Sequence, residues 1–382
     1  MNLRFVLAFV AAIFLSLQSA LAIETTARAA MVLDYNTGTV LLEKDADKAL
    51  PPASMSKLMT LNMVFEALED GRLSLDEKLP VSEHAMSYGG STMFLTTRDR
   101  VRVEDLIRGV IVLSGNDACA VLAEALAGSE TEFARSMTAR AKQLGMENST
   151  FGNSNGWPHP NQRMSARDLV ILAERLIREF PQYYNYFAER EFAFDDRSPA
   201  NRFNRNPLLK LGIGADGLKT GHTSEAGYGV VGSAEKNGRR VIVMLSGLDS
   251  EKARAEEAEK LMNWAFRQFV EKKIFESGDE VGRLNVWLGK ERSLGLVAQQ
   301  DVTLLLPVAV RDNLNAEIVA NAPVPAPVAK GAELATLLVE VPGMAAVEIP
   351  LFAAQSIDKA GFLSRIGLSA AIIREGLLGW VP

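Results

Sequence analysis

Ser54-Met55-Ser56-Lys57 is the first of three short motifs that follow one another along this chain, before Ser114-Gly115-Asn116 and Lys219-Thr220-Gly221. The first motif sets a hydroxyl nucleophile one helical turn from an amine that can take its proton. The second supplies another hydroxyl and a side-chain amide, and the third supplies a cation beside a glycine. A single S-x-x-K means little, because Ser356-Ile357-Asp358-Lys359 repeats the pattern near the C-terminus. The ordered set of three predicts an acyl-transfer active site.

The first motif is predicted to open a helix. Apolar residues recur every three or four positions up to Gly71, namely Leu58, Leu61, Phe65 and Leu68. This spacing places Ser54 at the start of the helix and Lys57 on the same face. Backbone N–H groups at a helix N-terminus lack intrahelical partners, so they can stabilise an oxyanion that forms beside Ser54.

The third motif is predicted to lie on a sheet. Residues 228–234 and 240–247 have the composition of strands and flank Asn237-Gly238, which is a strong hairpin signal. Residues 30–33 and 40–42 flank Asn36-Thr37-Gly38 in the same way. A long helix marked by Leu261, Ala265 and Phe269 is expected to cover this sheet.

The segment between the second and third motifs is predicted to be mainly helical. One apolar stripe consists of Phe133, Met137, Ala141 and Leu144. A second helix is expected to begin after Ser165, which with Asp168 has the spacing of a capping box, and to end at Pro181. Residues 153–160 between the two helices have loop composition and are expected to line a cleft.

The motifs and their flanks resemble the penicillin-recognising serine enzymes, and in particular the low-molecular-mass D-alanyl-D-alanine carboxypeptidases of the type-5 group. The flanks that carry the resemblance are residues 51–60, 114–119 and 216–223, and the likeness runs from about Ala29 to the C-terminus. The resemblance implies an α/β fold of the β-lactamase/transpeptidase type. Its catalytic domain would combine an antiparallel sheet with a helical lobe, followed by a small β-rich domain and a C-terminal amphipathic helix.

The resemblance also implies a reaction and a role for each site residue. The enzyme would remove the terminal D-alanine from a peptidoglycan stem pentapeptide through an acyl-enzyme, and β-lactams would inhibit it by acylating the same serine. Its catalytic residues would be Ser54 as nucleophile, Lys57 as proton acceptor and Ser114 as proton relay. Substrate binding would fall to Asn116, Lys219, Thr220, Gly221, Arg205 and His222, the last through its backbone N–H in the oxyanion hole.

One position departs from the family pattern, and three other functions stay open. Arg163-Met164-Ser165 stands where these carboxypeptidases usually carry a histidine before the helix-capping serine pair. A class A-like β-lactamase has the same three motifs but adds a glutamate in an E-x-x-L-N context, which residues 147–151 do not provide. A DD-endopeptidase is closer in chemistry, although relatives of that kind generally lack the C-terminal domain. A non-catalytic scaffold that binds peptidoglycan is the remaining alternative.

The composition excludes several other classes of function. A chain of 382 residues favours more than one domain, and a net charge of −6 offers no basic stripe for nucleic acid. Cys119 is the single cysteine, so no intramolecular disulfide can form. It is expected to be a small buried residue on the helix after the second motif. The three histidines lack metal-ligand spacing, so we expect neither a metal nor another cofactor.

Both ends of the chain carry targeting signals. Residues 1–22 combine Arg4, a short apolar run and Ala20-Leu21-Ala22, which is typical of a cleaved export signal. The mature protein would comprise a catalytic domain at 23–271, a β-rich domain at 272–358 and an amphipathic helix at 359–382. The apolar face of this helix suits a membrane interface. We therefore expect a periplasmic enzyme bound peripherally to the inner membrane, although docking of the helix on the β-rich domain would give the same periodicity.

Overall fold

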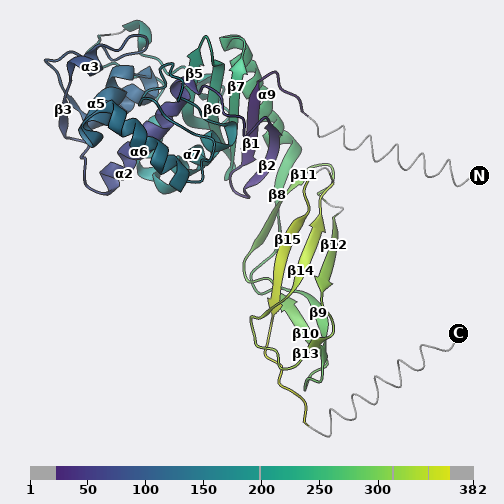
Figure 1. Cartoon of the computed structure of the whole chain (residues 1–382). Helices are drawn as coiled ribbons and strands as arrows, with labels where there is room; N and C mark the ends of the chain where they lie inside the picture. The colour runs from purple at the N-terminus through teal and green to yellow at the C-terminus, as the bar shows by residue number, and fades with distance from the viewer. Residues whose placement is uncertain (1–22, 198, 312–313, 343, 362–382) are drawn as a thin grey trace, which may run out of the picture. The chain divides into compact units, whose positions relative to one another are not determined.

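The computed structural model describes residues 23–361 apart from 198, 312–313 and 343 (Figure 1). The predicted export signal and the predicted amphipathic helix from residue 362 onward lie outside the described residues. Within the described ranges, no helix has both the length and the apolar character that a membrane span requires. The chain forms two compact units that divide between Arg267 and Gln268.

The N-terminal unit contains an antiparallel sheet with the strand order β2-β1-β7-β6-β5. Its strands are β1 (Ala29–Asp34), β2 (Thr39–Lys44), β5 (Ala215–Thr223), β6 (Gly227–Lys236) and β7 (Arg239–Leu248). Both predicted hairpins are confirmed, as is the position of the third motif on a strand. Asn237 and Gly238 turn between β6 and β7 with φ values of 55° and 80°. An Asn-Gly pair adopts these positive angles at little cost, which explains why the hairpin forms there.

A helical lobe packs on one face of the sheet (Figure 1). Its α-helices are α2 (Lys57–Glu69), α3 (Glu83–Met86), α4 (Val103–Arg108), α5 (Asn116–Ala127), α6 (Glu130–Gln143), α7 (Ala166–Glu179) and α8 (Pro181–Tyr184). Short helices of other types are η1 (Ala53–Ser56), η2 (Gly109–Leu113), η3 (Asn185–Ala188), η4 (Pro199–Asn201) and η5 (Pro207–Lys210), and β3 (Lys78–Pro80) pairs with β4 (Arg100–Arg102). The predicted cap of α7 is confirmed, because Ser165 Oγ accepts a hydrogen bond from the Asp168 backbone N–H at 3.1 Å.

The sheet is buried on both faces. Met31 and Leu33 of β1 pack against the helical lobe, whereas Ala30 and Val32 pack against α9 (Glu251–Gln268). The predicted covering helix is therefore confirmed. Alternate residues of one strand serve two cores because successive side chains point to opposite faces of a sheet.

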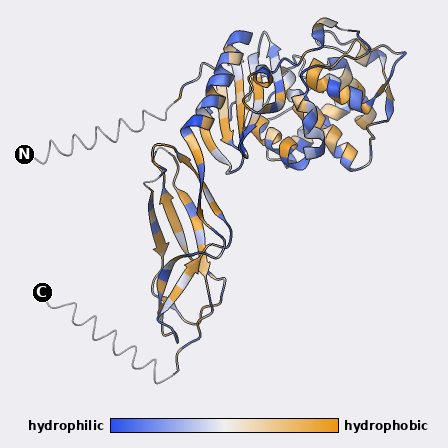
Figure 2. Cartoon of the chain, turned by 180° about the vertical axis from the view of Figure 1, so that it is seen from behind, coloured by the Kyte–Doolittle hydropathy of each residue, from blue (hydrophilic) through white to orange (hydrophobic). Residues whose placement is uncertain are grey.

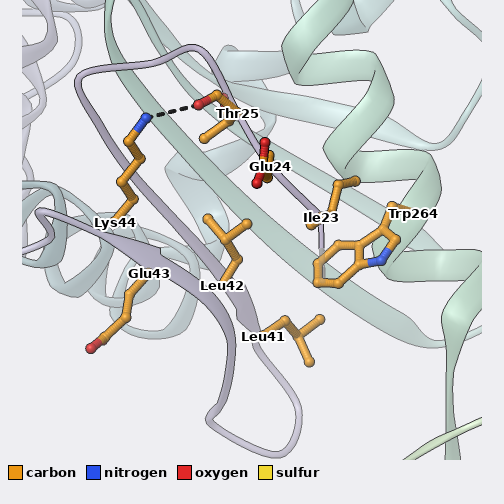
Figure 3. A pocket seen from close by; sticks show the side chains of 8 residues that line it. All are labelled: Ile23, Glu24, Thr25, Leu41, Leu42, Glu43, Lys44 and Trp264. Carbon is orange, nitrogen blue, oxygen red and sulfur yellow. Dashed lines mark hydrogen bonds between the residues drawn. The ribbon is translucent and has the colours of Figure 1, made fainter. Parts of the chain in front are cut away.

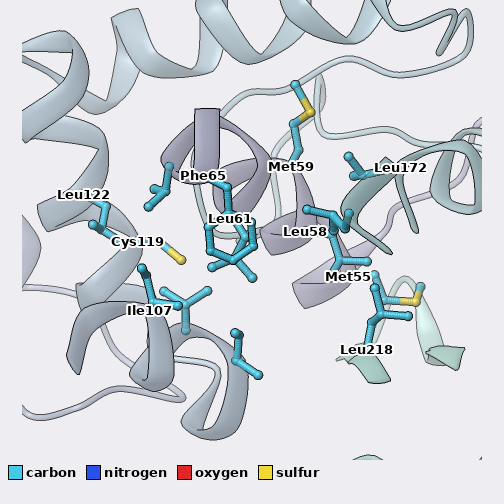
Figure 4. Close-up of a cluster of buried hydrophobic side chains, with 14 of the residues drawn as sticks. Met55, Leu58, Met59, Leu61, Phe65, Ile107, Cys119, Leu122, Leu172 and Leu218 are labelled. Carbon is cyan, nitrogen blue, oxygen red and sulfur yellow. The ribbon is translucent and has the colours of Figure 1, made fainter. Parts of the chain in front are cut away.

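Helix α2 lies at the centre of the helical lobe, where its apolar side chains meet those of α5, α7 and β5 (Figure 4). Phe65 and Leu61 are fully buried in this cluster. A helix that is apolar on nearly all sides belongs in an interior. Because Lys57 is the first residue of this helix, its side chain is carried into the protein and is also fully buried.

The C-terminal unit is β-rich, as predicted. A six-stranded sheet has the order β12-β14-β15-β10-β9-β13, and β11 pairs with β8. The strands are β8 (Phe269–Phe275), β9 (Glu280–Trp287), β10 (Ser293–Val297), β11 (Val302–Pro307), β12 (Asn315–Ala320), β13 (Val324–Pro325), β14 (Glu333–Glu340) and β15 (Val347–Ala353). Along β14, Ala335, Leu337 and Val339 are buried at every second position. Figure 2 shows hydrophobic residues along the strands of this sheet, which give the unit a core of its own.

A buried ion pair joins the two hairpins of the N-terminal sheet. Asp34, at the end of β1, lies 2.6 Å from Nε of Arg239 and is fully buried. The other oxygen of this carboxylate accepts hydrogen bonds from the backbone N–H and hydroxyl of Thr37 at 3.1 and 2.7 Å. Arg239 also donates to the Ala265 carbonyl of α9 at 3.0 Å. The pair therefore connects both hairpin turns to the covering helix.

The substitution Asp34→Asn should lower the free energy of unfolding by about 3–5 kcal/mol, because it leaves the charge of Arg239 buried without its counter-ion. Chemical denaturation followed by circular dichroism measures this change. The matched control is Asp45→Asn, an exposed aspartate in the next turn, which should change stability by no more than about 0.5 kcal/mol. Equal stability of the two variants would show that the ion pair does not hold the hairpins.

Candidate active site

The fold brings the three motifs together from separate elements. Ser54 lies in η1, and this short helix ends directly before Lys57, the first residue of α2. Ser114 is the residue between η2 and Gly115, and Asn116 begins α5. Two hydrogen bonds between lysine and serine side chains define the site: Lys57 Nζ lies 3.0 Å from Ser54 Oγ, and Lys219 Nζ lies 2.9 Å from Ser114 Oγ. The predicted nucleophile and base are thus within hydrogen-bonding distance.

Lys57 has three acceptors from three segments of the chain. Besides Ser54 Oγ, its Nζ contacts Asn116 Oδ1 at 2.8 Å and the backbone carbonyl oxygen of Asn155. Burial lowers the pKa of Lys57 from 10.5 to about 8. A neutral amine has two hydrogens and one lone pair. If the hydrogens go to Asn116 and Asn155, the lone pair faces Ser54 Oγ and can accept its proton.

The amide of Asn116 is held so that its oxygen faces Lys57. Its Nδ2 donates to the Gly89 carbonyl at 2.9 Å, and its backbone N–H donates to the Ser91 carbonyl at 2.8 Å. An amide fixed at one end by a carbonyl presents its own oxygen at the other end. Asn116 therefore orients the amine of Lys57, in addition to the substrate binding that the resemblance implies.

Lys219 and Ser114 form a second buried pair. Ser114 has a φ of 61°, a left-handed conformation that is uncommon for a residue other than glycine. Burial, with contributions from the nearby charges of Arg205 and Lys57, lowers the pKa of Lys219 well below its usual value. Each of the two serine hydroxyls therefore has a buried amine as its partner, and burial lowers the pKa of both amines.

Glycines allow the backbone to approach the turn that carries Ser54 from two sides. A Cβ atom on Gly221 would lie 2.8 Å from the Pro52 carbonyl oxygen and 3.2 Å from the Ala53 Cβ. Gly156 has a φ of 84°, and a Cβ atom there would lie 2.0 Å from the Ala53 carbonyl oxygen. Neither position has room for a side chain. The glycine of the third motif is therefore required for packing against the first motif.

The remaining predicted residues lie around these pairs. Thr220 is buried beside Lys219 on β5, and its carbonyl accepts from Lys219 Nζ at 3.3 Å. Arg205 donates to Ser91 Oγ and to the Leu113 carbonyl, both at 2.9 Å, so it lies next to the second motif. His222 is exposed at the end of β5, and its ring stacks on Tyr228 with a centroid distance of 3.9 Å.

Two residues with a place in this site were not among the site residues expected from the sequence, although the loop that contains Asn155 was expected to line a cleft. Asn155 contacts Lys57 through its backbone carbonyl, which no side-chain pattern can reveal. Glu130 accepts a hydrogen bond from Asn155 Nδ2 at 3.3 Å. Cys119 is fully buried on α5, as predicted, and burial raises the pKa of its thiol to about 12. Arg163, in the place of the family histidine, forms an ion pair of 3.2 Å with Glu225 in the turn after β5.

Among the pockets in the described part of the N-terminal unit, two lie outside the hydrogen-bonded pairs. One of about 460 Å³ adjoins the end of the third motif and is lined by Thr26, Arg28, His222, Thr223, Ser224, Glu225, Gly227, Tyr228, Gly247, Leu248 and Asp249. The other, of about 510 Å³, lies beside the edge strand β2 and Trp264 (Figure 3). It contains none of the predicted site residues, so it carries no functional assignment.

Comparisons with known proteins place the chain in one family. The sequence profile of the family described as D-alanyl-D-alanine carboxypeptidase matches residues 16–249, and that of the penicillin-binding protein 5 C-terminal domain matches residues 269–359. D-alanyl-D-alanine carboxypeptidase DacC of Escherichia coli is 35% identical over 371 residues, which cover 95% of this chain and 92% of that protein.

Solved structures give the same result. Penicillin binding protein 5 from Haemophilus influenzae is 33% identical, with a TM-score of 0.76 over 88% of this chain and 99% of that chain. Penicillin-binding protein D2 from Listeria monocytogenes, solved in an ampicillin-bound form, is 33% identical, with a TM-score of 0.58 over 64% of this chain and 99% of that chain. The two-lobe catalytic fold and the β-rich C-terminal domain are therefore those of the penicillin-binding proteins.

Proposed function

The chain belongs to the D-alanyl-D-alanine carboxypeptidase family, and from this premise we propose that it removes the terminal D-alanine of peptidoglycan stem pentapeptides through an acyl-enzyme on Ser54. The observation that carries the proposal is the 3.0 Å contact between Ser54 Oγ and the buried amine of Lys57. A buried amine with a pKa of about 8 has a substantial neutral fraction near physiological pH, which a proton acceptor needs.

Acylation begins with attack of Ser54 Oγ on the carbonyl carbon of the penultimate D-alanine. The hydroxyl proton passes to Lys57 Nζ as the new ester bond forms. The backbone N–H groups of Ser54 and His222 donate to the oxyanion, which lowers the barrier because charge develops there only in the transition state. Asn116 contributes by keeping the lone pair of Lys57 directed at the serine.

Departure of D-alanine needs a proton at its amine and a binding site for its carboxylate. Ser114 relays the proton, supported by its hydrogen bond to Lys219 at 2.9 Å. Lys219, Thr220 and Arg205 supply the cations and the hydroxyl that recognise the carboxylate. Gly221 allows β5 to lie against the turn of Ser54, so that the carboxylate site and the nucleophile are close. Water then hydrolyses the acyl-enzyme and regenerates Ser54.

We propose that β-lactams acylate the same serine, as the ampicillin-bound relative would suggest. A class A-like β-lactamase would instead hydrolyse the drug rapidly, and a DD-endopeptidase would cut peptidoglycan cross-links. A scaffold would catalyse none of these reactions. The mature protein incubated with pentapeptide, cross-linked peptide and penicillin separates these functions. D-alanine release from the pentapeptide with slow drug turnover supports the carboxypeptidase. Rapid drug turnover or cross-link cleavage without D-alanine release would contradict it.

We further propose that residues 1–22 form an export signal, 23–271 the catalytic domain, 272–358 the β-rich domain and 359–382 a helix that binds the inner-membrane surface from the periplasm. The support is the sequence pattern at the two ends of the chain. Membrane co-sedimentation of the mature protein with and without the last twenty residues or so tests the assignment of the helix.

The substitution Ser54→Ala should abolish both D-alanine release and covalent penicillin labelling, because the variant lacks the nucleophile that Lys57 serves. Gel detection of labelled penicillin and a D-alanine assay measure the two activities. The control is Ser356→Ala in the exposed second S-x-x-K sequence, which should leave both unchanged. Labelling that persists in Ser54→Ala would refute the assignment of the nucleophile.

The rate of penicillin acylation should rise with pH to a plateau, with a midpoint near 8. Only neutral Lys57 accepts the proton of Ser54, and burial places its pKa at about 8. Two pH units below the midpoint the neutral fraction is about one hundredth, so acylation should be about 100-fold slower than at the plateau. Stopped-flow rates at several pH values, with folding checked at each, measure the profile. A rate that is flat or falls with rising pH would exclude Lys57 as the base.

A further inference from the structure

Glu130 is a buried carboxylate surrounded by hydrogen-bond donors. It is the first residue of α6, with 8% of its surface exposed. One oxygen lies 2.7 Å from His84 Nε2 and 2.6 Å from the hydroxyl of Tyr88. The other accepts from the backbone N–H of Ser154 at 3.0 Å, from the Ser154 hydroxyl and from Asn155 Nδ2 at 3.3 Å. Both oxygens are therefore fully used.

These contacts lead directly to Lys57. The carbonyl of Ser154 accepts a hydrogen bond from the hydroxyl of Thr60 on α2, and the carbonyl of Asn155 accepts one from Lys57 Nζ. Glu130 thus accepts hydrogen bonds from N–H groups of Ser154 and Asn155, whereas the backbone carbonyls of the same two residues accept hydrogen bonds from side chains of α2. The segment is buried and its position decides where the third acceptor of Lys57 lies.

From this arrangement we infer that Glu130 is a positioning residue for Lys57: it fixes residues 154 and 155 so that the Asn155 carbonyl orients the amine toward Ser54. The inference deepens the proposed function and rests on Lys57 being the base. Glu130 itself does not contact the nucleophile in the described structure, and its effect passes through the backbone of Asn155.

A carboxylate suits this position better than an amide would. Its two oxygens face only donors, and an ionised carboxylate accepts at both ends. Burial tends to raise the pKa of Glu130, but the hydrogen bonds donated by Ser154, Tyr88 and His84 outweigh it and hold the pKa below its usual value. The group therefore stays ionised at the pH at which the enzyme would act.

The charge of Glu130 also influences Lys57. The titratable groups that act on Lys57 are Cys119, Arg205, Asp117, Glu130 and Lys219, and those around Glu130 include His84 and Tyr88. The negative charge of Glu130 favours the protonated form of Lys57 and so works to raise its pKa. Removal of that charge should lower the pKa of Lys57, while removal of a purely structural contact should not.

The test is the pH profile of penicillin acylation for the mature protein and for Glu130→Gln. An amide accepts hydrogen bonds at its oxygen but not at its nitrogen, so residues 154 and 155 should shift. The plateau rate of acylation should then fall about 10–100-fold, because displacement of a catalytic group by about 1 Å can slow a reaction by that factor. The midpoint of the profile should move to lower pH because the neighbouring charge is gone. Glu132→Gln is the matched control: Glu132 lies on the same helix, is exposed and pairs with Arg135, so its plateau and midpoint should match the wild type.

The inference requires both changes. An unchanged plateau rate, or a lower rate with an unmoved midpoint, would overturn it. If Glu130→Gln does not fold, as judged by circular dichroism, Ser154→Ala replaces it. That variant removes one hydroxyl donor but keeps the carboxylate, so the plateau should fall about tenfold with the midpoint unchanged. A wild-type rate in Ser154→Ala would then overturn the inference.

Ser54→Ala, assayed in parallel with these variants, tests the proposed function separately. Persistent penicillin labelling of Ser54→Ala would mean that Ser54 is not the nucleophile.

Discussion

The buried amine of Lys57 is the constraint on which the site depends. Lys57 is the first residue of a buried helix, so its amine is buried too. A buried amine needs hydrogen-bond acceptors, because an unsatisfied buried polar group costs free energy. The fold provides them from η1, from the start of α5 and from the loop at residue 155. The same burial that requires these acceptors lowers the pKa of the amine to about 8. Packing and reactivity therefore have one cause.

The second constraint is the close approach of backbones around Ser54. Strand β5 can lie against η1 only because Gly221 has no side chain, and the loop can pass on the other side only because Gly156 has none. The turn that carries Ser54 is thereby held between the sheet and the helical lobe. Lys219 contacts Ser114 from the same strand, so β5 provides both the second amine and, at Gly221, the backbone that packs against the turn of Ser54. Close packing of this kind fixes the positions of the reacting groups, which catalysis by positioning requires.

Much of this architecture was predictable from local sequence. Asn237-Gly238 fixes a hairpin through its backbone preference, Ser165 caps α7 through its own side chain, and the apolar spacing after Ser54 defines a buried helix. The first motif also predicted that Lys57 lies next to Ser54, because residues three apart are neighbours across one helical turn. The contacts of Asn155 and Glu130 were not predicted, although Asn155 lies in the loop at 153–160 that was expected to line a cleft. Asn155 acts through its backbone at a separation of 98 residues from Lys57, and Glu130 acts on Asn155 rather than on the site. Neither has a side-chain pattern near the motifs, so only the tertiary structure reveals them.

The central point is that Lys57 is neutral enough to act as a base because it is buried. The most direct measurement is an NMR titration of the lysine side-chain amines in the folded mature protein, with the Lys57 signal identified by its loss in Lys57→Met. The account predicts a titration near pH 8, about two and a half units below the ordinary lysine value of 10.5. A Lys57 signal that titrates at 10.5 or above would contradict it, because the amine would then be charged when Ser54 must lose its proton.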